Sequence, residues 1–363
     1  MSVRTGFGTM NRLLLLAAAP FFGMLLVLLY TGTDLALRIP ERDAAEAVPG
    51  ASAAADVRSA ALIGSLDSAR HTALEAAASL RQSASLYAST NRSMKQIAAA
   101  AAVQASHPLL VYDRRISRKL GMPSEHVQTG KITAQLYKLT AQHFKGYALK
   151  VRLKSPKAMK MVLGYDTVGK AETTLSAARR YKALAGVNAG GFADDGGRRY
   201  PLSTTVMGGR YIAGGFEPSR KDLFFVGLNE EMKLIGGKYA SRRQLDAESP
   251  RFGASFVPIL MKNGVPQRIP AKWAASPLRA PRTVVANYKD DQLLFIITDG
   301  YNEKGSSGAT LKELQILLQR FGVKDAYNLD GGGSSSLVFK GRVVNRPSDG
   351  RLRGVPTHFL FFK

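Results

Sequence analysis

The 363-residue sequence contains no cysteine, and this absence removes several kinds of chemistry at once. Disulfide bonds, thiolate nucleophiles, cysteine zinc sites and a lipid anchor on cysteine are all excluded. Aromatic residues make up only 8% of the chain, and no helix-turn-helix, zinc-finger or RNP-like pattern occurs, so the sequence does not favour a nucleic-acid-binding protein. The signatures G-x-x-x-x-G-K-[ST], G-x-G-x-x-G, H-E-x-x-H and G-x-S-x-G are missing as well.

Histidine is also scarce, and the five histidines are scattered along the chain. Only His358 lies in the region that carries the motifs described below. Because it falls on an apparent strand, we interpret it as a structural residue. A Ser-His-Asp hydrolase is therefore not favoured, and the chemistry of this chain must rest on carboxylates, asparagine, serine and arginine.

Acidic residues are few relative to basic ones, and the imbalance is confined to one part of the chain. The formal net charge is +24, and the 45% of hydrophobic residues is typical of a globular protein. Residues 1–110 hold 9 Lys/Arg and 7 Asp/Glu, a net +2, so residues 111–363 carry the remaining +22. Such a field concentrates anionic partners, and phosphate-containing glycans, wall polymers and lipid head groups are candidates. The alternative is a charge that only keeps the protein soluble near an anionic cell surface.

The N-terminal region contains one long apolar run. Residues 13–30 include no charge, and as a helix they would span about 27 Å, close to the thickness of a bilayer core. Arg4 and Arg12 precede the run, so the positive-inside rule predicts a cytoplasmic N-terminus and an extracytoplasmic remainder at the cell membrane. No small-x-small cleavage site follows directly, which favours an uncleaved anchor over residues 1–31 rather than a signal peptide.

Residues 32–108 are rich in alanine and poor in aromatics. Apolar residues recur every three or four positions, as one stripe of a helix would. Alanine favours helix and allows close helix pairing, so we predict a helical stalk that could join two copies of the chain; a flexible linker is the alternative. We expect Pro108 to end this helix and residues 109–143 to form a basic transition segment. The stripe comprises Ile63, Leu66, Ala69, Ala73, Ala77, Leu80 and Ala84.

Residues 144–363 show many short strand patterns and few helices, which predicts an α+β domain with a mixed β-sheet. The clearest helix covers residues 310–321, where Thr310 and Glu313 have capping-box spacing and Gly322 supplies a stop. A second helix is expected over residues 172–181. Strands are expected over residues 147–153, 160–165, 184–187, 224–228, 284–286, 293–298, 326–329, 336–339 and 358–362.

A glycine-rich segment between two of these strand patterns is the most informative part of the domain. Its sequence is Asn328-Leu329-Asp330-Gly331-Gly332-Gly333-Ser334-Ser335-Ser336. Three consecutive glycines cost backbone entropy and bury nothing, so a chain accepts them where it must turn through positive φ or approach a ligand closely. The N–H groups of such a turn can form a nest for an anion. A glycine-rich hairpin turn without chemistry is the alternative.

Other short motifs accompany this glycine turn in a fixed order. They are Asn188-Ala189-Gly190-Gly191, Pro281-Arg282-Thr283, Asp299-Gly300, Ser306-Ser307-Gly308, and Asn345-Arg346-Pro347-Ser348 with Arg353. The ordered set resembles the phosphodiester glycosidase family over roughly residues 144–363. The resemblance implies hydrolysis of a sugar-1-phosphodiester, with cleavage on the sugar side of the anomeric oxygen and departure of a phosphate anion.

The same resemblance implies roles for individual residues. Asp330, Asp299 and Asn188 are expected to be catalytic, and either carboxylate could be the nucleophile, the base or a ligand of a divalent cation. The alternative is that each aspartate only caps its own turn. Arg282 is expected to bind phosphate through two parallel hydrogen bonds. The further substrate-binding positions are Asn328, Gly332, Ser334, Ser335, Asn345 and Arg353.

These observations together predict a membrane-anchored, extracytoplasmic hydrolase that cleaves a sugar-1-phosphodiester in a glycan or wall polymer. The alternative is a non-catalytic glycan-binding or scaffold protein of envelope or exopolysaccharide assembly. The charge alone also allows nucleic-acid binding, which would be steeply salt-dependent and would release no sugar.

Overall fold

The structure is a computed structural model, and it describes residues 52–300 and 308–363. The chain divides into two compact units, Met1–Met94 and Lys95–Lys363. The membrane anchor predicted over residues 1–31 lies outside the described residues. Among the residues that are described, no helix is both long and apolar enough to cross a membrane.

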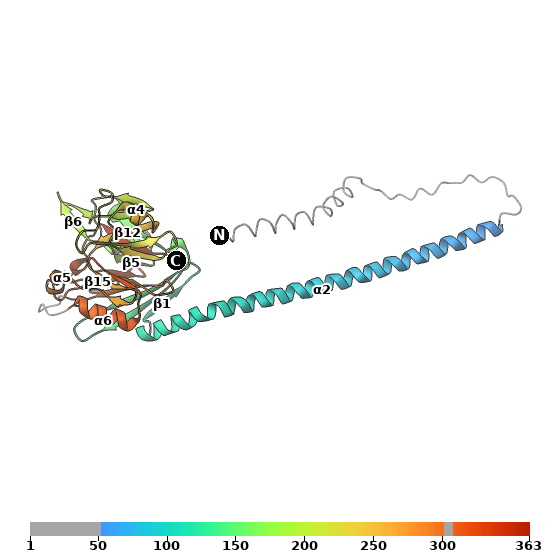
Figure 1. Ribbon diagram of the computed structural model, residues 1–363, viewed down its shortest axis with the longest axis horizontal. Coiled ribbons are helices and arrows are strands. Elements are labelled where there is room, and N and C mark those ends of the chain that lie inside the picture. Colours follow the sequence, from blue (N-terminus) through green and yellow to red (C-terminus); the bar gives the residue numbers. More distant parts are fainter. Residues whose placement is uncertain (1–51, 301–307) are drawn as a thin grey trace. The chain divides into compact units, whose positions relative to one another are not determined.

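A single long helix, α2 (Ser52–Leu120), covers the alanine-rich region (Figure 1). The predicted helix is therefore present, but Pro108 lies inside it instead of ending it. A proline removes one helical hydrogen bond, and here the turns after it continue because they carry residues that pack on the domain: Ile116 and Leu120 are buried. In the first unit the predicted stripe is open to solvent, with Ile63 and Leu66 about 60% exposed.

The last turns of α2 are attached to the domain through a buried lysine. Lys150 is 2% exposed, and its Nζ lies 2.8 Å from both Asp113 Oδ1 and Ser117 Oγ of the helix. Two strands follow α2 and pair with each other, β1 (Glu125–Gln128) and β2 (Ile132–Thr140). Residues 109–143 are thus not a separate transition segment, because they supply a docked helix end and two strands, and the predicted domain boundary at residue 144 falls inside the sheet.

Three sheets and one hairpin organise the described part of the second unit. The eight-stranded sheet has the order β1-β2-β3-β16-β15-β17-β13-β14, with β3 Lys145–Leu153, β13 Ile259–Lys262, β14 Val265–Pro266, β15 Arg282–Asn287, β16 Leu293–Thr298 and β17 Asp325–Leu329. One five-stranded sheet has the order β11-β10-β12-β8-β9, with β8 Thr205–Met207, β9 Arg210–Ile212, β10 Phe224–Asn229, β11 Leu234–Gly237 and β12 Pro250–Phe256. The other has the order β19-β18-β5-β20-β4, with β4 Met159–Leu163, β5 Ala185–Asn188, β18 Leu337–Phe339, β19 Arg342–Val343 and β20 Thr357–Phe361. The hairpin joins β6 (Phe192–Asp195) and β7 (Arg198–Pro201).

The expectation of a sheet-rich α+β domain with few helices is confirmed, and the sequence-predicted strands are present within one or two residues. The strand direction differs from a mixed sheet. Every strand pair in the described part of the chain runs antiparallel. Parallel neighbours need long crossover connections that are usually helical, and this domain has few helices to supply them.

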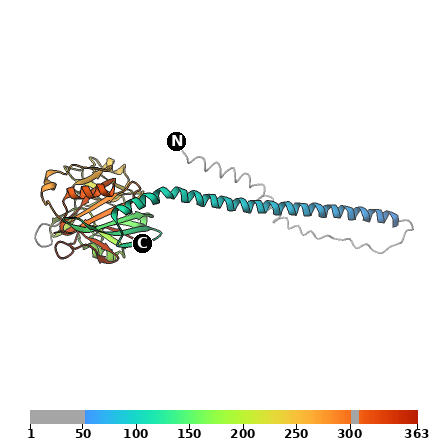
Figure 2. The same ribbon diagram turned by 90° about the horizontal axis from the view of Figure 1, so that it is seen from below.

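Short helices complete the domain: α3 (Thr174–Arg180), α4 (Arg242–Asp246), α5 (Ala271–Ala275) and α6 (Leu311–Phe321). The ends of α6 are as predicted, with a capping box between Thr310 and Glu313 and a left-handed Gly322 (φ 75°) at its C-terminus. The largest apolar core lies between the eight-stranded sheet and the two five-stranded sheets. A second core lies under α6 and the end of α2 on the outer face of the eight-stranded sheet. Figure 2 shows the ribbons of these elements from below.

The glycine turn is the point where the chain passes from one sheet to another. It leaves β17 of the eight-stranded sheet and enters β18 of a five-stranded sheet. Because its two flanking strands do not pair, the alternative of a simple hairpin turn does not hold. The candidate site is therefore built where two packed sheets meet.

Candidate active site

Backbone conformation explains one of the three glycines in the turn, and close packing explains the other two: a Cβ on Gly331 would lie 2.8 Å from Pro281 O. Gly332 has a φ of 60°, a conformation that glycine adopts without strain. A Cβ on Gly333 would collide with Asp349 and with the guanidinium of Arg353. A Cβ on Gly332 would meet no heavy atom within 4 Å, so the turn is tightly held from one side and open above Gly332.

The N–H groups of the turn are largely used by the protein itself. Gly332 N–H donates to Pro281 O at 2.8 Å, and the N–H groups of Ser334 and Ser335 donate to carbonyls within the turn at 3.2 and 3.1 Å. The predicted anion nest is therefore mostly closed, because these donors already have partners. Anion binding beside the turn must come from side chains.

Asn188 holds the turn in place from the end of β5. It is fully buried, and its Nδ2 donates to Asp330 O at 2.7 Å. Its Oδ1 accepts the hydroxyl of Thr283 and the N–H of Ser336, both at 3.0 Å. With these bonds made, Asn188 positions the backbone around Asp330 and is not exposed to a sugar hydroxyl.

Asp330 differs from its neighbours because part of its carboxylate has no partner. Its Oδ2 and the Oγ of Ser334 are both buried without a hydrogen bond to the part of the chain that the structure describes. Burial raises the pKa of Asp330 to about 6. The polar hydrogens of the nearby Ser334 hydroxyl and the Gly331 N–H lower the pKa, and the charges of Arg353 and Arg199 lower it electrostatically, but burial outweighs them. A carboxyl group with a pKa near neutrality beside an open turn is typical of a catalytic acid or base.

Two arginines supply positive charge at this carboxyl. Arg353 comes from the C-terminal loop, and its Nη2 lies 2.7 Å from Asp349 Oδ2. Arg199 comes from β7, where it binds Asp194 at 2.9 Å and the carbonyl of Gly354. Arg353 was expected at the site, whereas sequence reasoning missed Arg199. In a chain with 51 Lys and Arg residues, no local pattern distinguishes Arg199 from a surface charge.

Arg282 does not have the open position expected of a phosphate ligand. It is 6% exposed at the start of β15, and its Nη2 donates to Pro277 O at 2.7 Å. Its Nε donates to Ala309 O at 3.3 Å, while its backbone N–H binds Thr298 Oγ1 at 2.9 Å. These contacts fix the segments around β15 and leave the guanidinium largely shielded from solvent. Phosphate binding by Arg282 stays a prediction.

Asp299 lies directly after β16 and lines a cavity formed by its own surroundings. Its Oδ1 accepts the Arg346 N–H at 2.8 Å, and burial raises its pKa despite the opposing effects of Arg346 and Asn345. It lines a cavity of about 370 Å³ together with His143, Lys145 and Arg346, and Asp330 is not part of that lining. The pairing of Asp299 with Asp330 therefore stays a prediction.

The remaining predicted positions are buried supports of the turn. Asn345 accepts the Leu337 N–H at 2.7 Å and donates to Ser335 O at 3.0 Å, which joins the Asp299 loop to the glycine turn. Asn328 donates to Val257 O at 2.6 Å, and its Oδ1 is buried without a partner. Ser334 and Ser335 are each 1% exposed. Of these predicted positions, only Gly332 faces open space.

The charged side chains near Asp330 in the described part of the chain favour an anion over a cation. In residues 52–300 and 308–363, no group of three or more His, Asp or Glu side chains could hold a metal ion. The charged side chains that act on Asp330 are the guanidinium groups of Arg199 and Arg353, which repel a cation and attract a phosphate.

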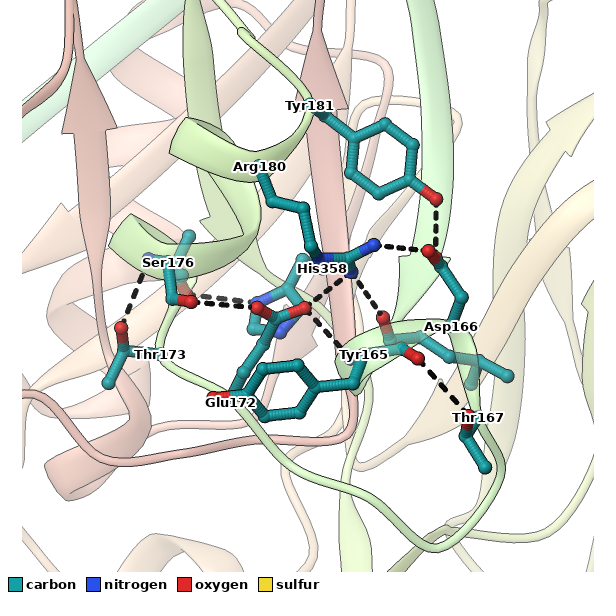
Figure 3. Close-up of polar contacts among 11 residues, drawn as sticks. Tyr165, Asp166, Thr167, Glu172, Thr173, Ser176, Arg180, Tyr181 and His358 are labelled. Atoms are coloured by element: carbon teal, nitrogen blue, oxygen red, sulfur yellow. Dashed lines mark hydrogen bonds and ion pairs between the residues drawn. The ribbon is translucent and has the colours of Figure 1, made fainter.

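A second polar network lies beside the site, around α3 and the loop before it (Figure 3). Its centre is Glu172, which binds Arg180 at 2.5 Å and Ser176 at 2.9 Å. His358 of β20 lies next to it and is fully buried, as expected of a structural histidine, and burial lowers its pKa to about 4. His358 Nδ1 is 3.2 Å from Thr174 Oγ1, which is 2.7 Å from the Ser336 hydroxyl at the end of the glycine turn.

Comparison with protein families agrees with this arrangement. The sequence model described as phosphodiester glycosidase matches residues 181–362, half of the chain. The chain belongs to the phosphodiester glycosidase family. The matched residues include Asn188, Arg199, Asp330 and Arg353, so the family region contains the side chains that meet at the glycine turn.

Individual relatives of this phosphodiester glycosidase domain cover it only in part. An uncharacterized SPbeta prophage-derived protein of Bacillus subtilis is 30% identical over 186 residues, 51% of this chain and 28% of its own length. The N-acetylglucosamine-1-phosphodiester alpha-N-acetylglucosaminidase of Bos taurus is 29% identical over 164 residues, 41% of this chain and 30% of its own length. The chain thus spans less than a third of these curated relatives.

A solved structure shares the fold. The catalytic domain of the zebrafish N-acetylglucosamine-1-phosphodiester alpha-N-acetylglucosaminidase, auto-inhibited by its pro-peptide, superposes with a TM-score of 0.54 at 19% identity. The match covers 67% of this chain and 87% of the zebrafish domain. At this identity the likeness concerns the fold, and the chemistry must be argued from the residues.

Proposed function

We propose that this phosphodiester glycosidase hydrolyses a sugar-1-phosphodiester in an extracytoplasmic glycan or wall polymer. The observation that carries the proposal is Asp330, a buried carboxyl with an unpartnered oxygen and a pKa of about 6, beside two arginines and an open glycine turn. The vertebrate relatives are named for cleaving N-acetylglucosamine from a 1-phosphodiester. Their names motivate the substrate class, and the wall polymer is our extension of it.

In this reaction the bond between the anomeric carbon and the phosphate oxygen breaks, and the bonding electrons leave with the phosphate. Positive charge grows on the sugar, and one carboxylate can stabilise it or accept a proton from the attacking water. Asp330 has the environment for this role, since it is ionised above about pH 6. The departing phosphate gains one negative charge, so Arg199 and Arg353 are our candidates to stabilise it in the transition state.

The cellular setting of the proposal rests on the sequence. The apolar run over residues 13–30 motivates a single-pass anchor in the cell membrane with the catalytic domain outside. The +22 charge of residues 111–363 suits a phosphate-rich polymer. Pairing of two chains through α2 is part of the same proposal, motivated by the exposed apolar stripe on that helix.

The decisive experiment offers the full-length protein a GlcNAc-1-phosphodiester and, separately, UDP-GlcNAc, and measures free GlcNAc over time. We expect sugar release by the wild type and its loss in Asp330→Asn. Saturable glycan binding without sugar release from any phosphodiester would instead support the alternative, a non-catalytic binding or scaffold protein. Because Asp330 forms no ion pair with any residue that the structure describes, the variant separates lost chemistry from lost folding.

A further inference from the structure

A cationic hollow lies at the edge of the five-stranded sheet that contains β5, β18 and β20. It has a volume of about 730 Å³, and its lining includes six basic residues and no acidic side chain. Six basic residues among eleven is far above the proportion in the whole chain, where 51 of 363 residues are Lys or Arg. The basic residues are Lys131, Lys157, Arg179, Lys182, Lys340 and Lys363.

Three of these side chains are available to a ligand. Lys157, Arg179 and Lys182 are exposed, and none of them forms an ion pair with any residue that the structure describes. The hollow's other cations are partly engaged, since Lys131 donates to Lys363 O at 3.0 Å and Lys340 lies 3.0 Å from Glu125 Oε2. A concave surface with unpaired cations focuses the field on its centre and favours anions.

The hollow and the candidate active site lie at opposite ends of the same three strands. Leu184, Lys340 and Phe362 border the hollow, each directly before or after a strand. At the other end of these strands are Asn188, the glycine turn and His358, and the register pairs Asn188 with His358. Three to five residues of strand separate the two ends, which is roughly 10–17 Å.

We propose that the cationic hollow is a second, non-catalytic binding site for phosphate groups of the same polymer whose phosphodiester is cleaved near Asp330. The inference rests on the proposed function. A chain with many phosphates can occupy the hollow with one segment while another segment enters the active site. The second contact raises the effective concentration of the scissile bond without taking part in the chemistry.

The lining favours such a polymer over the other anionic macromolecules. Insertion into a lipid surface needs exposed large apolar side chains, and none of the exposed large hydrophobic residues of the described chain borders the hollow. Binding of single-stranded nucleic acid uses several aromatic platforms, and Phe362 is the one aromatic residue of the lining. Phosphate charge, without bases or a bilayer, is what the hollow can recognise.

The test compares two triple variants of the full-length protein that remove the same charge. The hollow variant is Lys157→Gln, Arg179→Gln and Lys182→Gln. The control variant is Lys221→Gln, Lys312→Gln and Arg320→Gln, which are exposed basic residues outside the lining. Two of the control residues match residues of the hollow in backbone conformation. Lys221 has a φ of 51° and Lys182 a φ of 52°, while Arg320 and Arg179 lie in the last turns of α6 and α3.

The probe is a labelled linear polyphosphate of defined length, titrated at several salt concentrations. We expect the hollow variant to bind about tenfold more weakly and its log–log salt slope to fall by about 2, because each lost cation removes close to one released counterion. The control should stay within about twofold of the wild type. Equal losses in the two variants would show that affinity follows the net charge, and the proposal would fail.

Two further arms separate this inference from the proposed function. Hydrolysis of a small GlcNAc-1-phosphodiester, which is too short to reach both places, should be the same in wild type and hollow variant. If the wild type cleaves nothing, the proposed function fails while the polyphosphate result is judged on its own. Anionic phospholipid vesicles or a single-stranded oligonucleotide that depend on the hollow more strongly than polyphosphate does would overturn the assignment to a phosphate polymer.

Discussion

Two buried carboxylates, Glu172 and Asp330, lie near the same five-stranded sheet in opposite electrostatic states. Glu172 is fully partnered: its side chain accepts from the Tyr165 N–H at 2.9 Å as well as from Ser176 and Arg180 (Figure 3). Burial opposes ionisation, yet Arg180, the Tyr165 N–H and Ser176 together hold the pKa of Glu172 below its ordinary value. Asp330 instead keeps an oxygen without a partner and has a raised pKa.

The difference shows how burial of a charge can serve two purposes. Where a folded chain surrounds a carboxylate with donors, the group stabilises the fold and has no capacity left for a ligand. Where the chain buries a carboxylate and leaves it short of donors, folding is opposed at neutral pH and the group stays reactive. We interpret Glu172 as structural and Asp330 as functional on this ground, and the following predictions test that contrast.

The largest expected effect is on turnover in Asp330→Asn. Loss of the carboxylate should lower kcat for a GlcNAc-1-phosphodiester by about 10²-fold or more, the scale of one acid–base contribution. The variant should remain folded, because the amide has nearly the same size and no ion pair is broken. Sugar release together with circular dichroism measures both quantities. Normal turnover in a folded Asp330→Asn protein would return the glycine turn to a purely structural role.

Glu172→Gln should show the opposite behaviour. Glu172 is buried and Arg180 is 29% exposed, so losing the charge of Glu172 weakens a charged hydrogen bond that solvent partly screens, and we expect the free energy of unfolding to fall by about 2 kcal/mol. Arg180 keeps its contact with Asp166, which limits the loss. Denaturant unfolding measures the change, and turnover per folded molecule should stay within a few-fold of wild type. A stable Glu172→Gln protein with strongly reduced turnover would mean that the two carboxylates are not functionally distinct.

The pH dependence of stability should separate the two groups as well. A raised pKa means that the folded state binds the Asp330 proton more tightly, so this contribution is complete below about pH 4 and is lost as the pH rises through about 6. Asp330→Asn should therefore gain stability relative to wild type between pH 4 and 8, by about 2–3 kcal/mol. Urea unfolding of both proteins across this range gives the difference. A difference in the free energy of unfolding that does not change with pH would contradict the raised pKa of Asp330.

The smallest effect concerns the arginines, where Arg199→Lys and Arg282→Lys form a matched pair. If Arg199 binds the leaving phosphate, an ammonium cannot replace its planar fork, and kcat/KM should fall about tenfold with little loss of stability. Arg282→Lys should lower the free energy of unfolding by about 1–2 kcal/mol, because bonds to Pro277 O and Ala309 O are lost. Its folded fraction should retain turnover. Reduced turnover in folded Arg282→Lys, together with normal turnover in Arg199→Lys, would favour Arg282 as the phosphate ligand.

The local sequence pattern was sufficient to predict the helices and strands whose apolar spacing is regular and whose ends carry recognisable residues. The α6 helix follows from its apolar spacing, its capping box and Gly322, and the strands that flank the glycine turn follow from their apolar runs. The turn itself was identified because three glycines have no other physical justification. The presence of Asp330 at the site followed from the same segment.

Other features depend on contacts between distant segments, which no local pattern contains. The charge of Arg199 acts on Asp330 because β6 and β7 fold back beside the C-terminal loop. Asp299 and Asp330 have similar local sequences, each after an apolar strand and before glycine, yet the cavity that Asp299 lines does not include Asp330. The burial of Arg282 has no local sign in the sequence either, because it depends on Pro277 and Ala309, which neighbour it in space.

The passage of the glycine turn from one sheet to the other has a consequence for biosynthesis. Asn188 and Asp330 are separated by 142 residues, and the bond between them exists only when both sheets have packed. Contacts of such long sequence separation form late, because a large loop must close first. A nascent chain therefore has no catalytic centre until its last strands have emerged, and the appearance of activity would mark the completion of folding.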